Sequence, residues 1–151
     1  MSKNRLLILT ILFSLTSCNN VKPFKLDDKY YNKGNVIQDE NYELLNSALN
    51  DKESFVVVIY SLLTCINNFK DDIAGSYLSD KKIDYYLVDY ESGKQYATTI
   101  TSTIKYTPSV LIYKKGKCID YLKADNNDYI EAYSSKEGFA SWFEKYIILE
   151  K

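Results

Sequence analysis

The chain has 151 residues, of which 46% are hydrophobic and 26% are charged, a composition typical of one globular domain. It has no histidine, which excludes Ser-His-Asp and Cys-His catalytic relays and removes the commonest metal ligand. Lysine and arginine number 19 against 20 acidic residues, and the two signs are interspersed. Nucleic acid is therefore not an expected partner, because proteins that bind nucleic acid carry a concentrated basic surface.

The first seventeen residues have the pattern of a secretory signal. Two basic residues precede an apolar run of about ten residues, which is too short to span a bilayer as a helix. The run ends in Leu15-Thr16-Ser17-Cys18, which resembles the lipobox of bacterial lipoproteins. The resemblance implies that residues 1–17 are removed and that Cys18 carries a diacylglyceryl thioether. Acyl chains such as palmitate would then hold the protein in the lipid bilayer at the extracytoplasmic face of the cell membrane. The alternative is an ordinary cleaved signal peptide.

Residues 18–34 are mostly polar and show no apolar periodicity. We expect them to form the lipidated N-terminus and a tether that holds the domain off the bilayer. The alternative is an extra strand or cap built from Tyr30 and Tyr31.

From residue 35 onward, short strand-like segments alternate with helix-like segments. Strands are expected at 36–37, 55–60 and 83–90, and the second is an unbroken β-branched and aromatic run, typical of a strand buried on both faces. One helix is expected up to Asn50, with Asp39 as its candidate N-cap. A second is expected from Cys65, where apolar residues recur every four positions, and a third, weak in propensity, within 93–105.

The C-terminal third predicts a β-hairpin followed by a helix. The strands cover 109–113 and 118–122, and the turn between them is Lys114-Lys115-Gly116-Lys117. A capping box at 134–137 introduces a last helix with an aromatic face. The order β-α-β-α-β-α-β-β-α predicts a mixed sheet with helices on both faces.

This order and three local features resemble the thioredoxin fold over about residues 35–151. The buried strand 55–60 leads into a loop that ends on Cys65 at the start of a helix. Thr107-Pro108 directly precedes a hydrophobic strand, where the family has its cis-proline, and the turn at 114–117 is similar to the family's Lys-Asn-Gly turn. The resemblance implies an α/β fold, a thioredoxin-like three-layer α/β/α sandwich with a mixed central sheet.

The same resemblance implies the site residues. A thiolate at Cys65 would be stabilised by the free N–H groups at the helix N-terminus, which lowers its pKa and lets it attack a disulfide near neutral pH. Thr107, held by the cis peptide bond to Pro108, would pair with an extended substrate chain as a short β-bridge.

Three departures from the family pattern limit this expectation. Asn68 stands where the resolving cysteine should be, so a two-cysteine cycle is excluded at this site. Thr64 replaces the usual Trp, and Ile59 occupies the place where some members keep a buried carboxylate. An alternative register makes Cys65 the second cysteine and Leu62 the lost first one. The helical phase of the apolar residues after Cys65 favours the first register.

The remaining cysteine, Cys118, lies several strand widths from the Cys65 loop in this fold, which disfavours a disulfide between them. We expect Cys118 to be a small buried hydrophobe. Cys65 itself has an inert alternative, in which it packs on the apolar face of its helix. The acidic clusters near 27, 71 and 125 are expected to be solvated surface, and no metal or cofactor is expected.

Two functions follow from these features. The first is a lipid-anchored thioredoxin-like protein that acts on protein or peptide thiols and disulfides through Cys65 alone. The second is a binding module of the same fold, with a degenerate site, that holds an envelope protein or peptide in the cis-proline groove or on the last helix.

Overall fold

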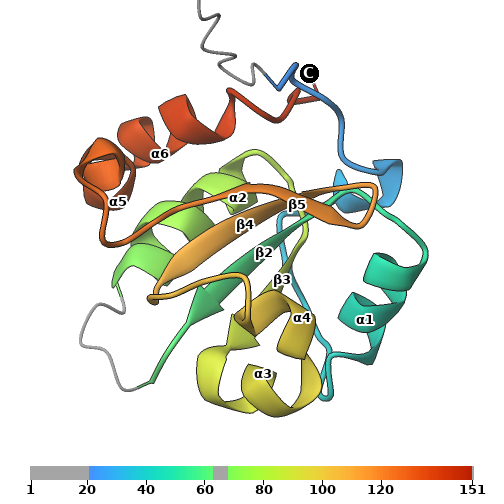
Figure 1. The fold of residues 1–151 in the computed structure, drawn as a ribbon. Coiled ribbons are helices and arrows are strands. Elements are labelled where there is room, and N and C mark those ends of the chain that lie inside the picture. Colours follow the sequence, from blue (N-terminus) through green and yellow to red (C-terminus); the bar gives the residue numbers. More distant parts are fainter. Residues whose placement is uncertain (1–20, 63–67, 151) are drawn as a thin grey trace, which may run out of the picture.

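The structure is a computed structural model that describes residues 21–62 and 68–150 (Figure 1). Five strands form one sheet in the order β1-β3-β2-β4-β5. The strands are β1 (Val36–Ile37), β2 (Phe55–Tyr60), β3 (Tyr85–Asp89), β4 (Ser109–Lys114) and β5 (Lys117–Tyr121). β1 and β2 run parallel to β3, whereas β4 is antiparallel to β2 and β5 is antiparallel to β4. The mixed sheet expected from the sequence is confirmed.

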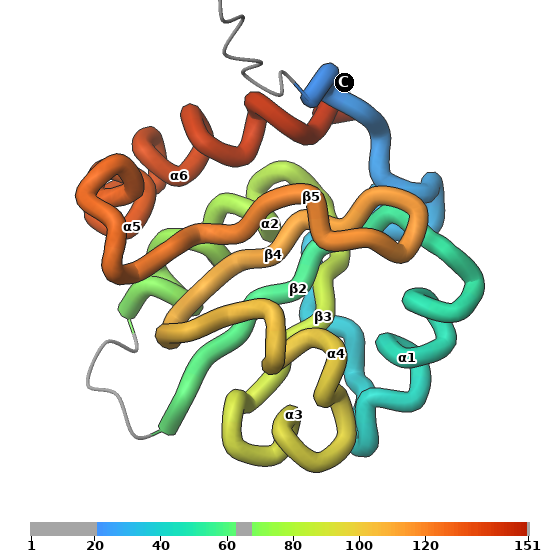
Figure 2. Tube along the Cα trace, viewed as in Figure 1, coloured from blue at the N-terminus to red at the C-terminus, as the bar shows by residue number. Residues whose placement is uncertain are grey.

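Helices cover both faces of the sheet, as the tube view in Figure 2 shows. One layer holds α1 (Glu43–Asn50), α3 (Tyr90–Tyr96) and α4 (Thr98–Thr101). The other holds the π-helix η2 (Phe69–Gly75), α2 (Ser76–Asp80), α5 (Ile130–Ser134) and α6 (Lys136–Phe143). Two short 3-10 turns, η1 (Asp28–Tyr30) and η3 (Asn127–Tyr129), complete the described elements.

The central strand β2 is the axis of the core. Its first five residues, Phe55–Ile59, are completely buried, as an apolar run without alternation predicts for a strand covered on both faces. The ring of Phe55 stacks on that of Tyr113 in the neighbouring strand at 4.8 Å between centroids. Burying side chains of this size stabilises the fold by about 1.5–3 kcal/mol each relative to exposure.

Two helical segments differ from their sequence expectation. The chain enters α3 directly at the end of β3, because the Asp89 carboxylate caps the helix by accepting from the Ser92 N–H at 3.0 Å. The weak helix expected at 93–105 is divided between the end of α3 and α4, which are separated at Ala97 by an extended, non-helical φ of −134°.

The last helix is preceded by α5, which the sequence analysis did not predict. The N-cap of α6 is Ser135, whose hydroxyl accepts from the Gly138 N–H. The Ser134 hydroxyl instead donates to the Ile130 carbonyl. The predicted capping box is therefore displaced by one residue. Gly138 allows the close packing of α5 on α6, because a Cβ at that position would lie 2.0 Å from the Glu131 carbonyl oxygen.

The segment before β1 packs onto the domain and is not a tether over its described length. Phe24, Leu26 and Tyr30 are buried, and the Phe24 N–H donates to the Tyr146 carbonyl. The expectation of a tether at 18–34 is therefore wrong for these residues, and the alternative, a cap that includes Tyr30, describes them better. Charged residues separate the three apolar ones, so the sequence shows no periodicity although the chain is in full contact with the core.

Within the described residues, no helix combines the length and the apolar character needed to cross a bilayer.

Candidate functional site

The Thr107–Pro108 peptide bond is cis, as expected from the sequence. Pro108 is buried and Thr107 is partly exposed, immediately before β4. The first residue of β4, Ser109, pairs with Ile59 near the end of β2. The cis-proline therefore lies beside the end of β2, after which the chain continues toward Cys65.

Tyr133, on α5, fixes the cis-proline loop from the helical layer. Its hydroxyl lies 2.8 Å from the Pro108 carbonyl oxygen and 3.1 Å from the Leu122 carbonyl oxygen, so that one proton is shared between two acceptors. The Ser109 hydroxyl donates to the same Leu122 carbonyl at 2.7 Å. Burial raises the pKa of Tyr133, which keeps the hydroxyl protonated as a donor at neutral pH.

The two flanks of the Cys65 segment differ in their surroundings, and one of them reaches the cis-proline through Tyr133. On one side, Ser61 is buried, whereas the Leu62 side chain that follows is 75% exposed. On the other side, the buried ring of Phe69 packs on the ring of Tyr133, the residue that holds Pro108, at 4.7 Å.

The residues between these flanks include Thr64 and Cys65, and they lie outside the described residues, as does Cys18. The catalytic role expected for Cys65 and the lipidation expected for Cys18 stay predictions. Asn68, in the place of a resolving cysteine, has helical backbone angles and an exposed side chain.

Asp89 is a carboxylate at this end of the sheet that the sequence analysis did not single out. It pairs with Tyr60 in the register of β3 and β2. One carboxylate oxygen accepts from Ser92, whereas Oδ2 is buried and has no hydrogen-bond partner among the described residues. Buried polar atoms are normally paired, so this oxygen is a candidate acceptor for a group that approaches the end of β2.

Cys118 lies at the opposite end of the sheet from the cis-proline. It pairs with Tyr113, which in turn pairs with Phe55 at the start of β2. Its thiol is 3.5 Å from the Asp120 carbonyl oxygen, and burial raises its pKa to about 12. The thiol is therefore protonated and a poor nucleophile at neutral pH, which agrees with a packing role, although the residue is only partly buried.

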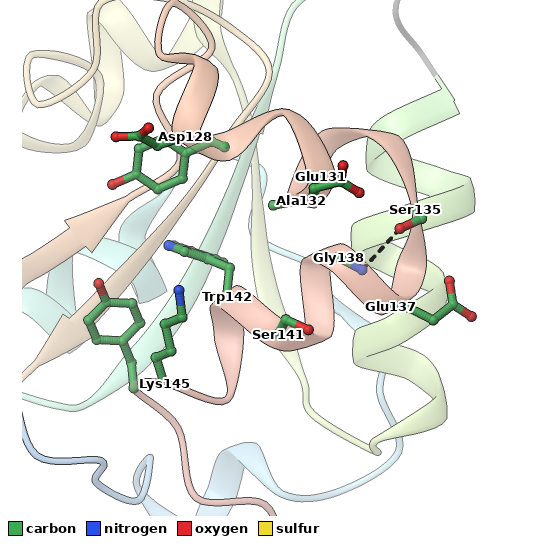
Figure 3. Close-up of a pocket in the computed structure, with 11 residues that line it drawn as sticks. Asp128, Glu131, Ala132, Ser135, Glu137, Gly138, Ser141, Trp142 and Lys145 are labelled. Carbon is green, nitrogen blue, oxygen red and sulfur yellow. Dashed lines mark hydrogen bonds between the residues drawn. The ribbon is translucent and has the colours of Figure 1, made fainter.

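A second candidate site is a hollow of about 500 Å³ over α5 and α6, drawn in Figure 3. Tyr129, Trp142 and Tyr146 supply its aromatic part, and the lining includes three carboxylates, those of Asp128, Glu131 and Glu137. Trp142 and Tyr146 both donate to the Asp120 carboxylate, at 3.3 and 2.6 Å, which fixes their orientation. Among the residues the structure describes, no group of three side chains is arranged to hold a metal ion.

Sequence reasoning missed Tyr133, Asp89 and the hollow for different reasons. Tyr133 is on a five-residue helix that has too few turns to show a period. Asp89 carries a recognisable signal, because an aspartate is a favoured N-cap residue where a strand ends and a helix begins. The hollow depends on how α5 crosses α6, which no local pattern encodes.

Comparison with known proteins shows the fold. No protein-family model matches the sequence, and no relative was found among curated proteins. A mutant thioredoxin from Halobacterium salinarum aligns with a TM-score of 0.53 at 9% identity, over 80% of this chain and 97% of that one. Thioredoxins from Aeropyrum pernix (TM-score 0.51, 11% identity, 75% and 88% covered) and Malassezia sympodialis (0.50, 16%, 74% and 90%) align similarly. The expected α/β thioredoxin-like fold is confirmed. At these identities the likeness extends to the fold alone.

Proposed function

We propose that this thioredoxin-like protein exchanges disulfides through the single thiol of Cys65, outside the cytoplasm and anchored to a membrane. The observation that carries the proposal is the cis Thr107–Pro108 bond beside the end of β2. In this fold that position faces the loop of the reactive cysteine, and this chain keeps a cysteine in that loop.

The exchange needs no cofactor and is redox-neutral overall. The Cys65 thiolate attacks one sulfur of a substrate disulfide, which forms a mixed disulfide and releases the other sulfur as a thiolate. Because Asn68 cannot resolve this intermediate, a second, external thiolate attacks the mixed disulfide and releases Cys65. Thr107 and Pro108 hold the substrate chain in extended form during both steps.

The test is thiol alkylation of the native chain across pH, with each cysteine peptide quantified by mass spectrometry. We expect Cys65 to react at a rate that has already levelled off near neutral pH, as a lowered pKa requires. Cys118 is an internal reference, because its raised pKa keeps it slow until the protein is unfolded. A Cys65 thiol that reacts only after denaturation would contradict the proposal.

Three variants test the reaction itself. The mixed disulfide with an oxidised peptide should accumulate on the native chain, disappear in Cys65→Ser and persist in Cys118→Ser. In Asn68→Cys a second thiol is available three residues after Cys65, so the intermediate should decay without an external thiol. Accumulation that is equal in the Cys65→Ser variant would contradict a role for this residue.

The anchor rests on the lipobox residues that end at Cys18. We expect the mature N-terminal peptide to begin at Cys18 and to carry a diacylglyceryl group in its mass, and the protein to sediment with membranes. Cys18→Ser should abolish the modification and leave a longer, uncleaved chain. An N-terminus at any other residue would contradict this part of the proposal.

The second candidate function is a binding module, and the hollow over α6 is the observation that favours it. Trp142 is the only tryptophan of the chain, so its fluorescence reports directly on occupancy of the hollow. Under this function, envelope peptides shift the emission of Trp142, and the shift survives in Cys65→Ser. A Cys65→Ser strain with an unchanged phenotype would favour binding over exchange.

A further inference from the structure

The two ends of the sheet differ in character. β4 runs antiparallel to β2, so that Ser109 pairs with Ile59 and Tyr113 pairs with Phe55. The cis-proline pole, defined by Tyr60, Asp89 and Pro108, therefore lies one strand length from the hairpin pole. The hairpin pole is defined by the 114–117 turn and the start of β2. Six residues of strand separate the poles by roughly 20 Å.

The N-terminal segment joins the domain at the hairpin pole. The Lys114 ammonium lies 4.8 Å from the centre of the buried Phe24 ring. Three residues later, the Asp27 N–H donates to the Ser54 carbonyl, just before β2. Figure 1 shows this first described segment beside the C-terminal end of the chain, across the sheet from the start of β4.

Lysines gather at the same pole. Lys22, Lys52, Lys115 and Lys117 are exposed and Lys114 is partly exposed. None of these five forms an ion pair with another described residue, whereas Lys25 and Lys29 are paired with Glu150 and Glu53. The Gly116 N–H donates to the Glu53 carbonyl at 2.7 Å, which fixes the hairpin turn against the turn that carries Lys52.

The hairpin places like charges against each other. Lys114 and Lys117 are directly paired across the two strands, and Lys115 between them has a positive φ of 51°. Like charges opposite one another destabilise a strand pair, and a lysine in left-handed backbone is uncommon. Exposed acids of this pole, Asp28 and Asp51, lie on neighbouring turns and form no ion pair with another described residue. An external anionic surface would offset the repulsion.

We infer that the hairpin pole, through Lys22, Lys52, Lys114, Lys115 and Lys117, docks on the anionic phospholipid surface of the membrane to which the chain is anchored. The inference rests on the proposed acylation of Cys18. Phe24 is the sixth residue after Cys18, a stretch that spans at most about 20 Å, so the anchor holds the pole that Phe24 joins close to the headgroups. The site at the cis-proline pole then faces away from the bilayer, where a protein substrate can reach it.

The experiment is lysine labelling of the full acylated chain on vesicles. The chain is reconstituted on phosphatidylcholine alone and on phosphatidylcholine with one third phosphatidylglycerol, and the acetylation of each lysine is followed by mass spectrometry. We expect Lys52, Lys115 and Lys117 to react about threefold more slowly on the anionic vesicles. Lys94, on α3 just after β3, and Lys105, shortly before the cis-proline, should react equally on both.

Paired variants separate the docking from general attraction. Lys115→Asn with Lys117→Gln, where Asn tolerates the left-handed backbone, should remove the protection of Lys52. Lys94→Gln with Lys105→Gln removes the same amount of charge elsewhere on the molecule and should leave the protection of Lys52 intact. Because the Debye length falls to about 3 Å at molar salt, high salt should also abolish the protection.

Four outcomes would overturn the inference. Equal labelling on the two vesicles excludes the docking while the acylation stands, and protection of Lys105 equal to that of Lys117 excludes the orientation. Protection by inorganic phosphate without vesicles would assign the lysines to a free anion. An unmodified Cys18 in the mature protein would overturn the anchor and, with it, the docking.

Discussion

Tyr133 is the residue that joins the helical layer to the cis-proline. Its hydroxyl donates a hydrogen bond shared between the carbonyl oxygens of Pro108 and Leu122. We expect Tyr133→Phe to lower the free energy of unfolding by about 1–2 kcal/mol, because it leaves a carbonyl without its donor. Urea unfolding measures this loss, and Tyr96→Phe, at an exposed position, is the matched control.

The Ser109 hydroxyl makes the Tyr133 prediction sharper, because it shares the Leu122 acceptor. In a double-mutant cycle, Ser109→Ala and Tyr133→Phe should be non-additive by about 0.5 kcal/mol or more. Strict additivity, or a Tyr133→Phe variant as stable as the parent protein, would show that the hydroxyl does not hold the loop.

Cys118 gives a prediction of chemical reactivity. With a pKa of about 12, its thiolate is scarce at mildly alkaline pH. We expect native Cys118 to be alkylated at least about a hundredfold more slowly than a free cysteine and to react normally in urea. The measurement uses Cys65→Ser, so that one cysteine of the domain remains. A rate near that of the free amino acid would contradict the burial of this thiol.

At the scale of the element, the start of α6 distinguishes two adjacent serines. Ser135 caps the helix by accepting from Gly138, whereas Ser134 bonds within α5. We expect Ser135→Ala to cost about 1 kcal/mol of stability and Ser134→Ala only a few tenths. Urea unfolding of the two variants decides between them, and the reverse order would support the capping box predicted from the sequence.

The strands were predictable because their signal is local. β2 is buried on both faces and is therefore apolar throughout, and the hairpin has glycine in its turn at a φ of 73°. The start of α6 was less predictable, because Ser135 competes with an equally good neighbouring cap, Ser134. The break between α5 and α6 depends on packing, since Gly138 is required by the Glu131 backbone of another helix.

The candidate site was predictable in part. The resemblance of Thr107-Pro108 to the cis-proline site of thioredoxins implied the cis bond, which the structure confirms. Sequence could not indicate that Tyr133 reaches Pro108, because the two are 25 residues apart and meet only through the fold. The same holds for part of the hairpin pole, because Lys22 and Lys52 are far in sequence from the adjacent lysines 114, 115 and 117.

At the scale of the whole molecule, buried tyrosines set the response to alkali. Burial raises the pKa of Tyr30, Tyr77 and Tyr113 above the ordinary value of about 10. The folded state therefore keeps protons that the unfolded chain releases. The contribution of these tyrosines to the free energy of unfolding is fully present below pH 10 and falls as the pH rises beyond it.

We expect a loss of about 1 kcal/mol for each such tyrosine by about pH 11. Urea unfolding at successive pH values measures the slope, and tyrosinate absorbance should rise together with unfolding. Tyr113→Phe should flatten the slope, because it removes one of the three hydroxyls with a raised pKa. At neutral pH it should lower the stability only slightly, because it removes little more than a hydroxyl. A stability that is constant across this range would contradict the burial of the three hydroxyls.

The N-terminal segment tests how far the domain extends. Phe24 is 9% exposed and has backbone hydrogen bonds to Tyr146 and Ile148. We expect Phe24→Ala to destabilise the protein by about 3 kcal/mol, and Pro23→Ala, at an exposed neighbour, to have little effect. If the segment were only a tether, both variants would unfold at the urea concentration of the parent protein.

The contact between Phe24 and the segment 146–148 also determines when folding of the domain can be completed during synthesis. The Tyr31 hydroxyl donates to the Ile148 carbonyl, 117 residues further along the chain. During synthesis from the N-terminus, the backbone of Phe24 waits for these partners until nearly the whole domain has emerged. The sheet strands β1, β2 and β3 can pair earlier, but the two ends of the domain close last. A polypeptide truncated before residue 146 therefore exposes the apolar side chains that this closure covers, and is the form most prone to aggregate.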